Sequence, residues 1–156
     1  MLYVALNNIR SLYNVGSIFR TADAFGVDKI ILGGYTGTPP RKEITKVALG
    51  AEKYIKWEKS FNLHTRLLEL KNQGFEIIGL ENNNFKIKTS NLNKFKLKLP
   101  AVLVLGNEVN GITPAVLKKI DRFIEIPMKG IKESLNVSVA FGIALYAIKE
   151  KRCFKC

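Results

Sequence analysis

Residues 101–113 have the sequence AVLVLGNEVNGIT, in which five apolar residues are followed at once by a polar loop that contains two glycines. A short apolar run that ends in a turn signal is typical of a strand buried on both faces, as strands of parallel sheets are. In open α/β sheets, ligands bind beyond the carboxyl ends of the strands. The stretch therefore predicts a buried strand whose end carries part of a ligand site.

Strand-like and helical segments alternate along the rest of the chain. Ile18, Phe19 and Ala22 have helical spacing, and Gly26 ends that segment. The alternation predicts an α/β fold with a mostly parallel sheet, and residues 1–156 contain no linker, so we expect a single domain. The expected strands are residues 3–6, 29–32, 54–57, 76–80, 101–105 and 123–126. The expected helices are residues 15–25, a basic segment that begins near residue 41, residues 63–71, a short helix that begins at Pro114, and residues 136–151.

The chain is strongly basic: 25 Lys and Arg stand against 13 Asp and Glu, for a formal net charge of +12. Such a charge suits nucleic acid binding, because neutralised phosphates release counterions, although solubility alone also accounts for it. No stretch approaches the ~18 consecutive apolar residues of a membrane span. The N-terminus becomes polar too soon for a secretory signal. We therefore expect a cytoplasmic protein without a membrane segment.

Metal binding and histidine chemistry are not expected. Cys153 and Cys156 form a C-x-x-C pair, which is half of a zinc site, and the sequence offers no second half. We predict reduced thiols and no bound metal. His64 is the only histidine, and it lies outside the polar loops described below.

Residues 84–99, NFKIKTSNLNKFKLKL, are rich in Lys and Asn and have two interpretations. They form either a basic RNA surface, with Phe85 and Phe95 beside the lysines, or an edge strand whose lysines block aggregation. The edge strand is favoured.

The loop at residues 106–113 resembles the phosphate-binding pattern G-x-x-x-x-G-K-[ST], but Ile112 takes the place of the lysine. Glu108 would also put a negative charge where phosphates must sit. No G-x-G-x-x-G follows any expected strand, so a dinucleotide site is not predicted either. A nucleoside-like ligand with a positive centre fits this loop better.

Polar residues also gather before the last expected helix and near the first one. Gly130, Ser134 and Asn136 precede the last helix, and helix capping explains one such residue but not the cluster. Arg20 lies six residues after Asn14 in an otherwise apolar helix. Taken alone, an isolated helical arginine is usually only a solvated side chain.

Together these segments resemble the three motifs of the SpoU (TrmH) family of RNA 2′-O-ribose methyltransferases, within the SPOUT superfamily. The likeness covers nearly the whole chain, with one departure: Val109 stands where many members have glycine. The matching segments are NVGSIFRTA (14–22) with residues 25–26, LGNE (105–108) with Gly111 and Ile112, IPM (126–128), ESLNVSVA (133–140), and ALGAE (48–52) followed by Trp57.

The resemblance implies a deep trefoil knot in the C-terminal part of the α/β domain, and a homodimer with active sites at the interface. It implies S-adenosylmethionine as cofactor, held by backbone groups of three loops. The implied cofactor-binding residues are Leu80, Leu105, Gly106, Gly111, Ile126, Met128, Ser134 and Leu135. The implied catalytic residues are Arg20, Asn14, Glu108, Ser134 and Asn136.

The expected activity is methylation of a ribose 2′-hydroxyl. We expect tRNA as the RNA, because the first motif begins soon after Met1 and leaves no room for an added RNA-binding domain. The alternatives are an rRNA 2′-O-methyltransferase and a non-catalytic RNA-binding protein on the same fold. Because an arginine stays protonated, we expect Arg20 to hydrogen-bond the hydroxyl and clamp a phosphate instead of acting as a base.

Overall fold

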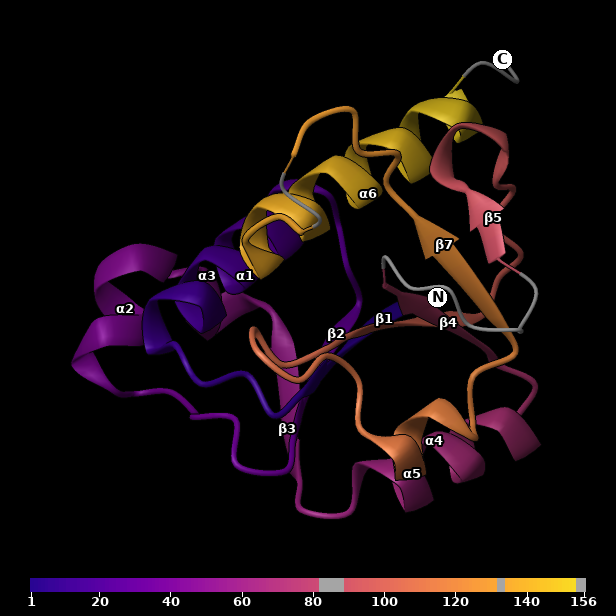
Figure 1. The fold of residues 1–156 in the computed structure, drawn as a ribbon. Coiled ribbons are helices and arrows are strands. Elements are labelled where there is room, and N and C mark those ends of the chain that lie inside the picture. Colours follow the sequence, from indigo (N-terminus) through magenta and orange to yellow (C-terminus); the bar gives the residue numbers. More distant parts are fainter. Residues whose placement is uncertain (82–88, 132–133, 154–156) are drawn as a thin grey trace.

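The computed structural model describes residues 1–81, 89–131 and 134–153, with side chains described as far as residue 150. Of the residues discussed above, Phe85, Glu133 and Cys156 lie outside these ranges. Within them, seven strands form one sheet in which every neighbouring pair is parallel (Figure 1). The order is β3-β2-β1-β6-β4-β7-β5. The strands are β1 (Leu2–Asn7), β2 (Lys29–Gly33), β3 (Lys56–Ser60), β4 (Glu76–Leu80), β5 (Thr89–Asn91), β6 (Ala101–Leu105) and β7 (Arg122–Glu125).

Helices cover both faces of this sheet, which confirms the α/β prediction (Figure 1). Because side chains alternate along a strand, the strands β1, β2, β4, β6 and β7 contribute side chains to two hydrophobic cores, one on each face of the sheet. Val4 packs into the core beneath α1, α2 and α6, while the next residue, Ala5, packs into the core beneath α4 and α5. The helices are α1 (Leu12–Ala24), α2 (Lys42–Ala48), α3 (Ala51–Tyr54), α4 (Leu63–Asn72), α5 (Pro114–Leu117) and α6 (Val137–Cys153), with a 3₁₀ turn η1 at Leu92–Lys94.

The strand register brings the ends of distant segments together. β6 lies between β1 and β4, so that Leu105 pairs with Leu6 on one side and with Leu80 on the other. β7 continues the row, with Ile124 opposite Leu80. All these strands are parallel, so the loops that follow them leave the sheet at the same edge.

One prediction about local structure was wrong, and one of the two alternatives for residues 84–99 does not hold for Phe95. The strand expected at residues 54–57 begins later, because Ala51–Tyr54 forms α3 after Leu49 and Gly50, both of which have positive φ (51° and 94°). Phe95 is not on an RNA surface: it is 2% exposed, and the Arg122 guanidinium carbon lies 4.5 Å from its ring centroid. β5 does lie at the margin of the sheet beside β7, but it contains none of the lysines on which the edge-strand interpretation was based.

Within the described ranges, none of the helices has the length and apolar character needed to cross a membrane.

Candidate active site

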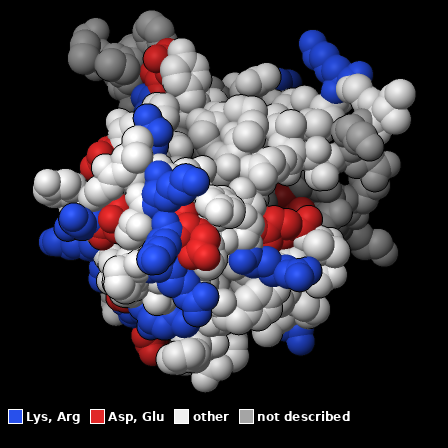
Figure 2. Space-filling model, turned by 90° about the vertical axis from the view of Figure 1, so that its left-hand side faces the viewer, with Lys and Arg blue, Asp and Glu red and all other residues white. Residues whose placement is uncertain are grey.

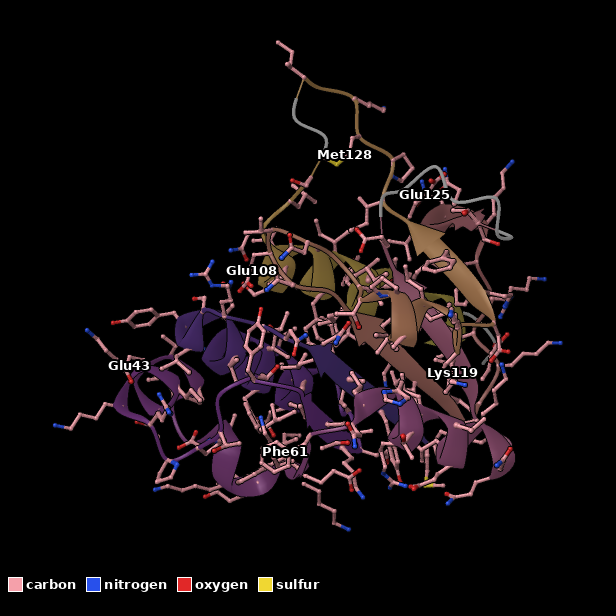
Figure 3. The ribbon with its side chains drawn as sticks, turned by 60° about the horizontal axis from the view of Figure 1, so that its bottom comes forward. Glu43, Phe61, Glu108, Lys119, Glu125 and Met128 are labelled. Atoms are coloured by element: carbon pink, nitrogen blue, oxygen red, sulfur yellow. The ribbon has the colours of Figure 1, made fainter. Side chains whose placement is uncertain are left out.

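A cavity of about 700 Å³ opens at the ends of β4, β6 and β7 and the start of α6. Its size lies within the ~300–1,000 Å³ of ordinary ligand sites. Apolar side chains at the ends of the three strands, Leu80, Leu105 and Ile126, form part of its wall. All the predicted cofactor positions line the cavity except Met128, which is half-buried on the loop after β7 (Figure 3).

The loop after β6 is held in a tight turn. Asn107 and Gly111 exchange backbone hydrogen bonds of 2.9 Å, and Gly111 has a φ of 65°. A Cβ on Gly106 would lie 2.5 Å from backbone atoms of Gly111 and Ile112, so only glycine fits there. Val109 is 74% exposed and its φ is not positive, so the turn does not need the glycine that many members of the family have at this position.

The Glu108 carboxylate joins this loop to the start of α1. It accepts hydrogen bonds from the backbone N–H groups of Arg10 (3.0 Å) and Ser11 (3.1 Å) and from the Asn14 amide (2.9 Å). Burial opposes the charge, but these donors outweigh it and hold the pKa of Glu108 below its usual value of about 4.5. A carboxylate in this place also suits the positive end of the α1 dipole. Glu108 is therefore an anion that fixes the loop to the helix.

Asn14 and Asn136 extend this contact to the third loop. The Asn136 amide donates to Asn14 Oδ1 (3.1 Å), and Asn136 Oδ1 accepts from the backbone N–H (2.9 Å) and the hydroxyl (2.6 Å) of Ser138. Asn136 thus caps α6 as Ser and Asn commonly do. It also closes a chain from Glu108 through Asn14 to α6, so one polar network positions three segments that are far apart in the sequence.

Two of the predicted catalytic residues lie outside this network. Ser134 is exposed and lines the cavity. Arg20 is exposed on α1 and does not line the cavity. Six residues turn a helix by about 240° beyond one full turn, so Arg20 and Asn14 point in different directions. Within the described residues, the Arg20 guanidinium makes no hydrogen bond or ion pair.

Glu81 is a site residue that the sequence analysis missed. It follows β4 directly and lines the cavity, and its carboxylate accepts a hydrogen bond from the Ile112 backbone N–H (3.2 Å). Burial raises the pKa of Glu81, and this single donor offsets only part of the effect. Its place immediately after Leu80, at a strand end, is the signal that could have identified it.

The structure is that of a ligand-binding α/β protein. Its parallel sheet has a cofactor-sized cavity at the strand ends, and hydrogen bonds fix the loops around this cavity to the first turns of two helices. Comparison with known proteins makes the assignment specific. Residues 1–146 match the model of the SpoU rRNA Methylase family, and the chain belongs to that family.

Relatives support this membership. The tRNA (guanosine(18)-2′-O)-methyltransferase of Aquifex aeolicus (strain VF5) is 36% identical over 152 residues, which are 97% of this chain and 70% of that protein. The solved A. aeolicus TrmH/SpoU tRNA modifying enzyme is 35% identical with a TM-score of 0.86, over 99% of this chain and 76% of that one. An AdoMet-bound rRNA methyltransferase from Sinorhizobium meliloti is 26% identical with a TM-score of 0.85, over 96% and 56%. The chain spans only 57–58% of the length of further relatives from Staphylococcus.

Proposed function

We propose that this protein transfers a methyl group from S-adenosylmethionine to a ribose 2′-hydroxyl of RNA, with tRNA as its substrate. The observation that carries the proposal is the cavity of about 700 Å³ bordered by the Glu108–Asn14–Asn136 network. The A. aeolicus relative, named as a methyltransferase of tRNA guanosine 18, supports tRNA over rRNA.

The residues present fit S-adenosylmethionine. Leu80, Leu105 and Ile126 offer apolar walls, while Gly106 allows the tight turn of the loop that lines the cavity, because a Cβ there would clash with the backbone of Gly111 and Ile112. Glu81 supplies a carboxylate inside the cavity, which suits a ligand with a positive centre. When bound, the cofactor supplies the methyl group.

The polar residues then act mainly by positioning. Glu108, Asn14 and Asn136 hold the three loops in place, and alignment of donor and acceptor can supply much of the rate. Arg20 hydrogen-bonds the ribose hydroxyl and stabilises the negative charge that develops on its oxygen. The proton leaves to a phosphate oxygen or to water.

The position of Arg20 leads us to propose a homodimer in which this residue faces the cavity of the other protomer. An exposed apolar stripe along α6 supports an interface there: Val139 (49% exposed), Ile143 (40%) and Tyr146 (57%) recur at helical spacing. Tyr13, on the neighbouring α1, is 53% exposed. Because α1 packs against α6, an interface on these two helices would bring Arg20 of α1 to the other protomer.

We also propose that the C-terminal part is knotted. The order β6-β4-β7 and the packing of α6 onto the α1 face support a chain that passes back across the strand ends after β7. An experimental structure in which residues 126–136 pass outside the other loops would contradict the knot.

A basic face supports RNA as the partner. Figure 2 shows Lys and Arg side chains in a band across the side that carries α2 and α3. Lys42, Lys46 and Lys53 are exposed there, and cations at such spacing release counterions from a phosphate backbone.

Incubation with methyl-labelled S-adenosylmethionine and either tRNA or rRNA, followed by mapping of 2′-O-methyl nucleotides, tests the activity. We expect label at a ribose of tRNA. Calorimetry should show S-adenosylhomocysteine binding and no comparable binding of ATP, since the loop lacks a phosphate-binding lysine. Label confined to rRNA would contradict the choice of RNA, and label on bases would contradict the reaction.

A further inference from the structure

A second hollow, of about 110 Å³, lies at the ends of β1 and β2, next to the segment that follows β3 and the starts of α4 and α5. Its lining includes Asn8, Phe61, His64 and Thr113. Its volume is far below the ~300–1,000 Å³ of sites that enclose a whole cofactor, so it suits a single small group. None of the residues implicated in catalysis lines it, so the methyl-transfer site does not account for it.

Phe61 is the unusual wall of this hollow. It is 82% exposed on the segment between β3 and α4 (Figure 3), although its ring is large enough to contribute substantially to a core. The Lys59 ammonium lies 5.3 Å from the ring centroid and donates a hydrogen bond to the Thr36 carbonyl (2.6 Å). An exposed aromatic face beside a fixed cation is the combination on which proteins stack unpaired bases.

Polar groups complete the hollow. The side-chain oxygen of Asn8 (Oδ1) accepts a hydrogen bond from the Tyr35 backbone N–H (3.1 Å). Among the described residues, the side-chain nitrogen of Asn8 (Nδ2) donates no hydrogen bond. His64, at the start of α4, adds a ring that can donate or accept a hydrogen bond. Donors and acceptors around an aromatic platform match the edges of a nucleobase.

This hollow is connected to the active-site loop. The Asn107 side-chain amide donates to the backbone carbonyl of Asn8 (2.7 Å) and to the hydroxyl of Tyr35 (2.8 Å), and Asn107 itself lines the larger cavity. The hollow lies at the ends of β1 and β2 and the cavity at the ends of β4, β6 and β7, so both lie at the same edge of the parallel sheet. A short stretch of RNA that follows this edge can contact both.

We propose that the hollow walled by Asn8, Phe61 and His64 receives an unpaired RNA base that stacks on Phe61, a few nucleotides from the reacting ribose. The proposal rests on the proposed function. The net charge of +12 and the cation at Lys59 favour RNA as the occupant. A second copy of the chain is disfavoured, because Lys56 and Lys59 lie on edge strand β3 and lysines there oppose strand pairing.

The test compares Phe61→Ala with Leu68→Ala. Leu68 is a control because it is also an exposed apolar side chain (41% exposed), but it lies on α4 outside the lining of the hollow and away from the basic band on α2 and α3. Filter binding to an unmodified tRNA transcript should weaken about 5- to 150-fold for Phe61→Ala, the range expected for a lost base–aromatic stack. Leu68→Ala should change the affinity less than about twofold, because it leaves the ring of Phe61 in place. Phe61→Tyr should retain most of the affinity, because it keeps an aromatic ring at position 61. Calorimetry with S-adenosylhomocysteine should not distinguish any of these variants from the wild type.

Photo-crosslinking supplies a second readout. A transcript that contains 5-bromouridine should crosslink at Phe61 of the wild-type protein, and Leu68→Ala should retain this crosslink. Equal effects of the two alanine variants on binding, or a change of oligomeric state in Phe61→Ala, would overturn the proposal. Binding and crosslinking need no turnover, so they decide this proposal even if no methyl transfer is found. Conversely, methyl transfer that is indifferent to Phe61 would refute only the base site.

Discussion

Subunit mixing tests whether Arg20 serves the cavity of the other protomer. The first variant is Arg20→Ala. Because Arg20 is exposed and makes no polar contact in the described residues, its loss should change the free energy of unfolding by no more than about 0.5 kcal/mol. Turnover should nevertheless fall at least ~10²-fold, as when a donor to a developing oxyanion is removed.

The second variant is Glu108→Ala, which damages the cavity and leaves Arg20 intact. It loses three hydrogen bonds, all at solvent-accessible positions, so a stability cost of about 1–2 kcal/mol is expected and the protein should still fold. Each variant alone should have little activity. The reason for the low activity differs between the two variants: one lacks the arginine, and the other lacks an ordered loop beside the cavity.

Co-refolding equal amounts of the two variants should restore activity. Random pairing makes about half of the dimers mixed, and one of the two sites in each mixed dimer combines an intact cavity with an intact Arg20, so about one quarter of wild-type turnover should return. The assay is transfer of labelled methyl groups to tRNA, with co-refolded wild-type protein as the reference. If the mixture is no more active than its parents while sedimentation shows dimers, Arg20 does not act across the interface.

Two further predictions concern the active-site loop. The pKa of Glu108 is lowered in the folded protein, so its contribution to stability is full above the unfolded value of about 4.5 and is lost as the pH falls through the folded value. The difference in unfolding free energy between wild type and Glu108→Gln should therefore shrink in acid, and a difference independent of pH would contradict it. Gly106→Ala should abolish S-adenosylhomocysteine binding in calorimetry, because the new Cβ would lie 2.5 Å from backbone atoms. The control is Gly142→Ala on α6, where the nearest atom to the new Cβ is 3.9 Å away. This variant should keep both the affinity for S-adenosylhomocysteine and the unfolding temperature of the wild type.

Local patterns were enough to predict most elements of the fold. The apolar run at residues 101–105 became β6, and the alternation of strands and helices predicted the parallel sheet, because burial on both faces demands continuous apolar runs. The sequence pattern did not predict burial correctly where a residue's neighbours in the sequence differ in character from its neighbours in the folded protein. Phe95 follows Lys94 and precedes Lys96 in the sequence, yet it is buried in the core beneath α1, α2 and α6.

The chemical nature of the site was also contained in the sequence: Asn14, Glu108 and Asn136 were identified as residue types in loops, and the family likeness joined them. Their roles came only from the tertiary structure. Hydrogen bonds across 94 and 122 residues of chain make Glu108 and Asn136 partners of Asn14, and no local pattern encodes such pairings. The tertiary structure also decides the positions of Arg20, Glu81 and Phe61. The strand order and the orientation of each helix about its axis determine which side chains of distant segments lie at one edge of the sheet. They therefore leave Arg20 and the ring of Phe61 exposed and put the carboxylate of Glu81 in the cavity.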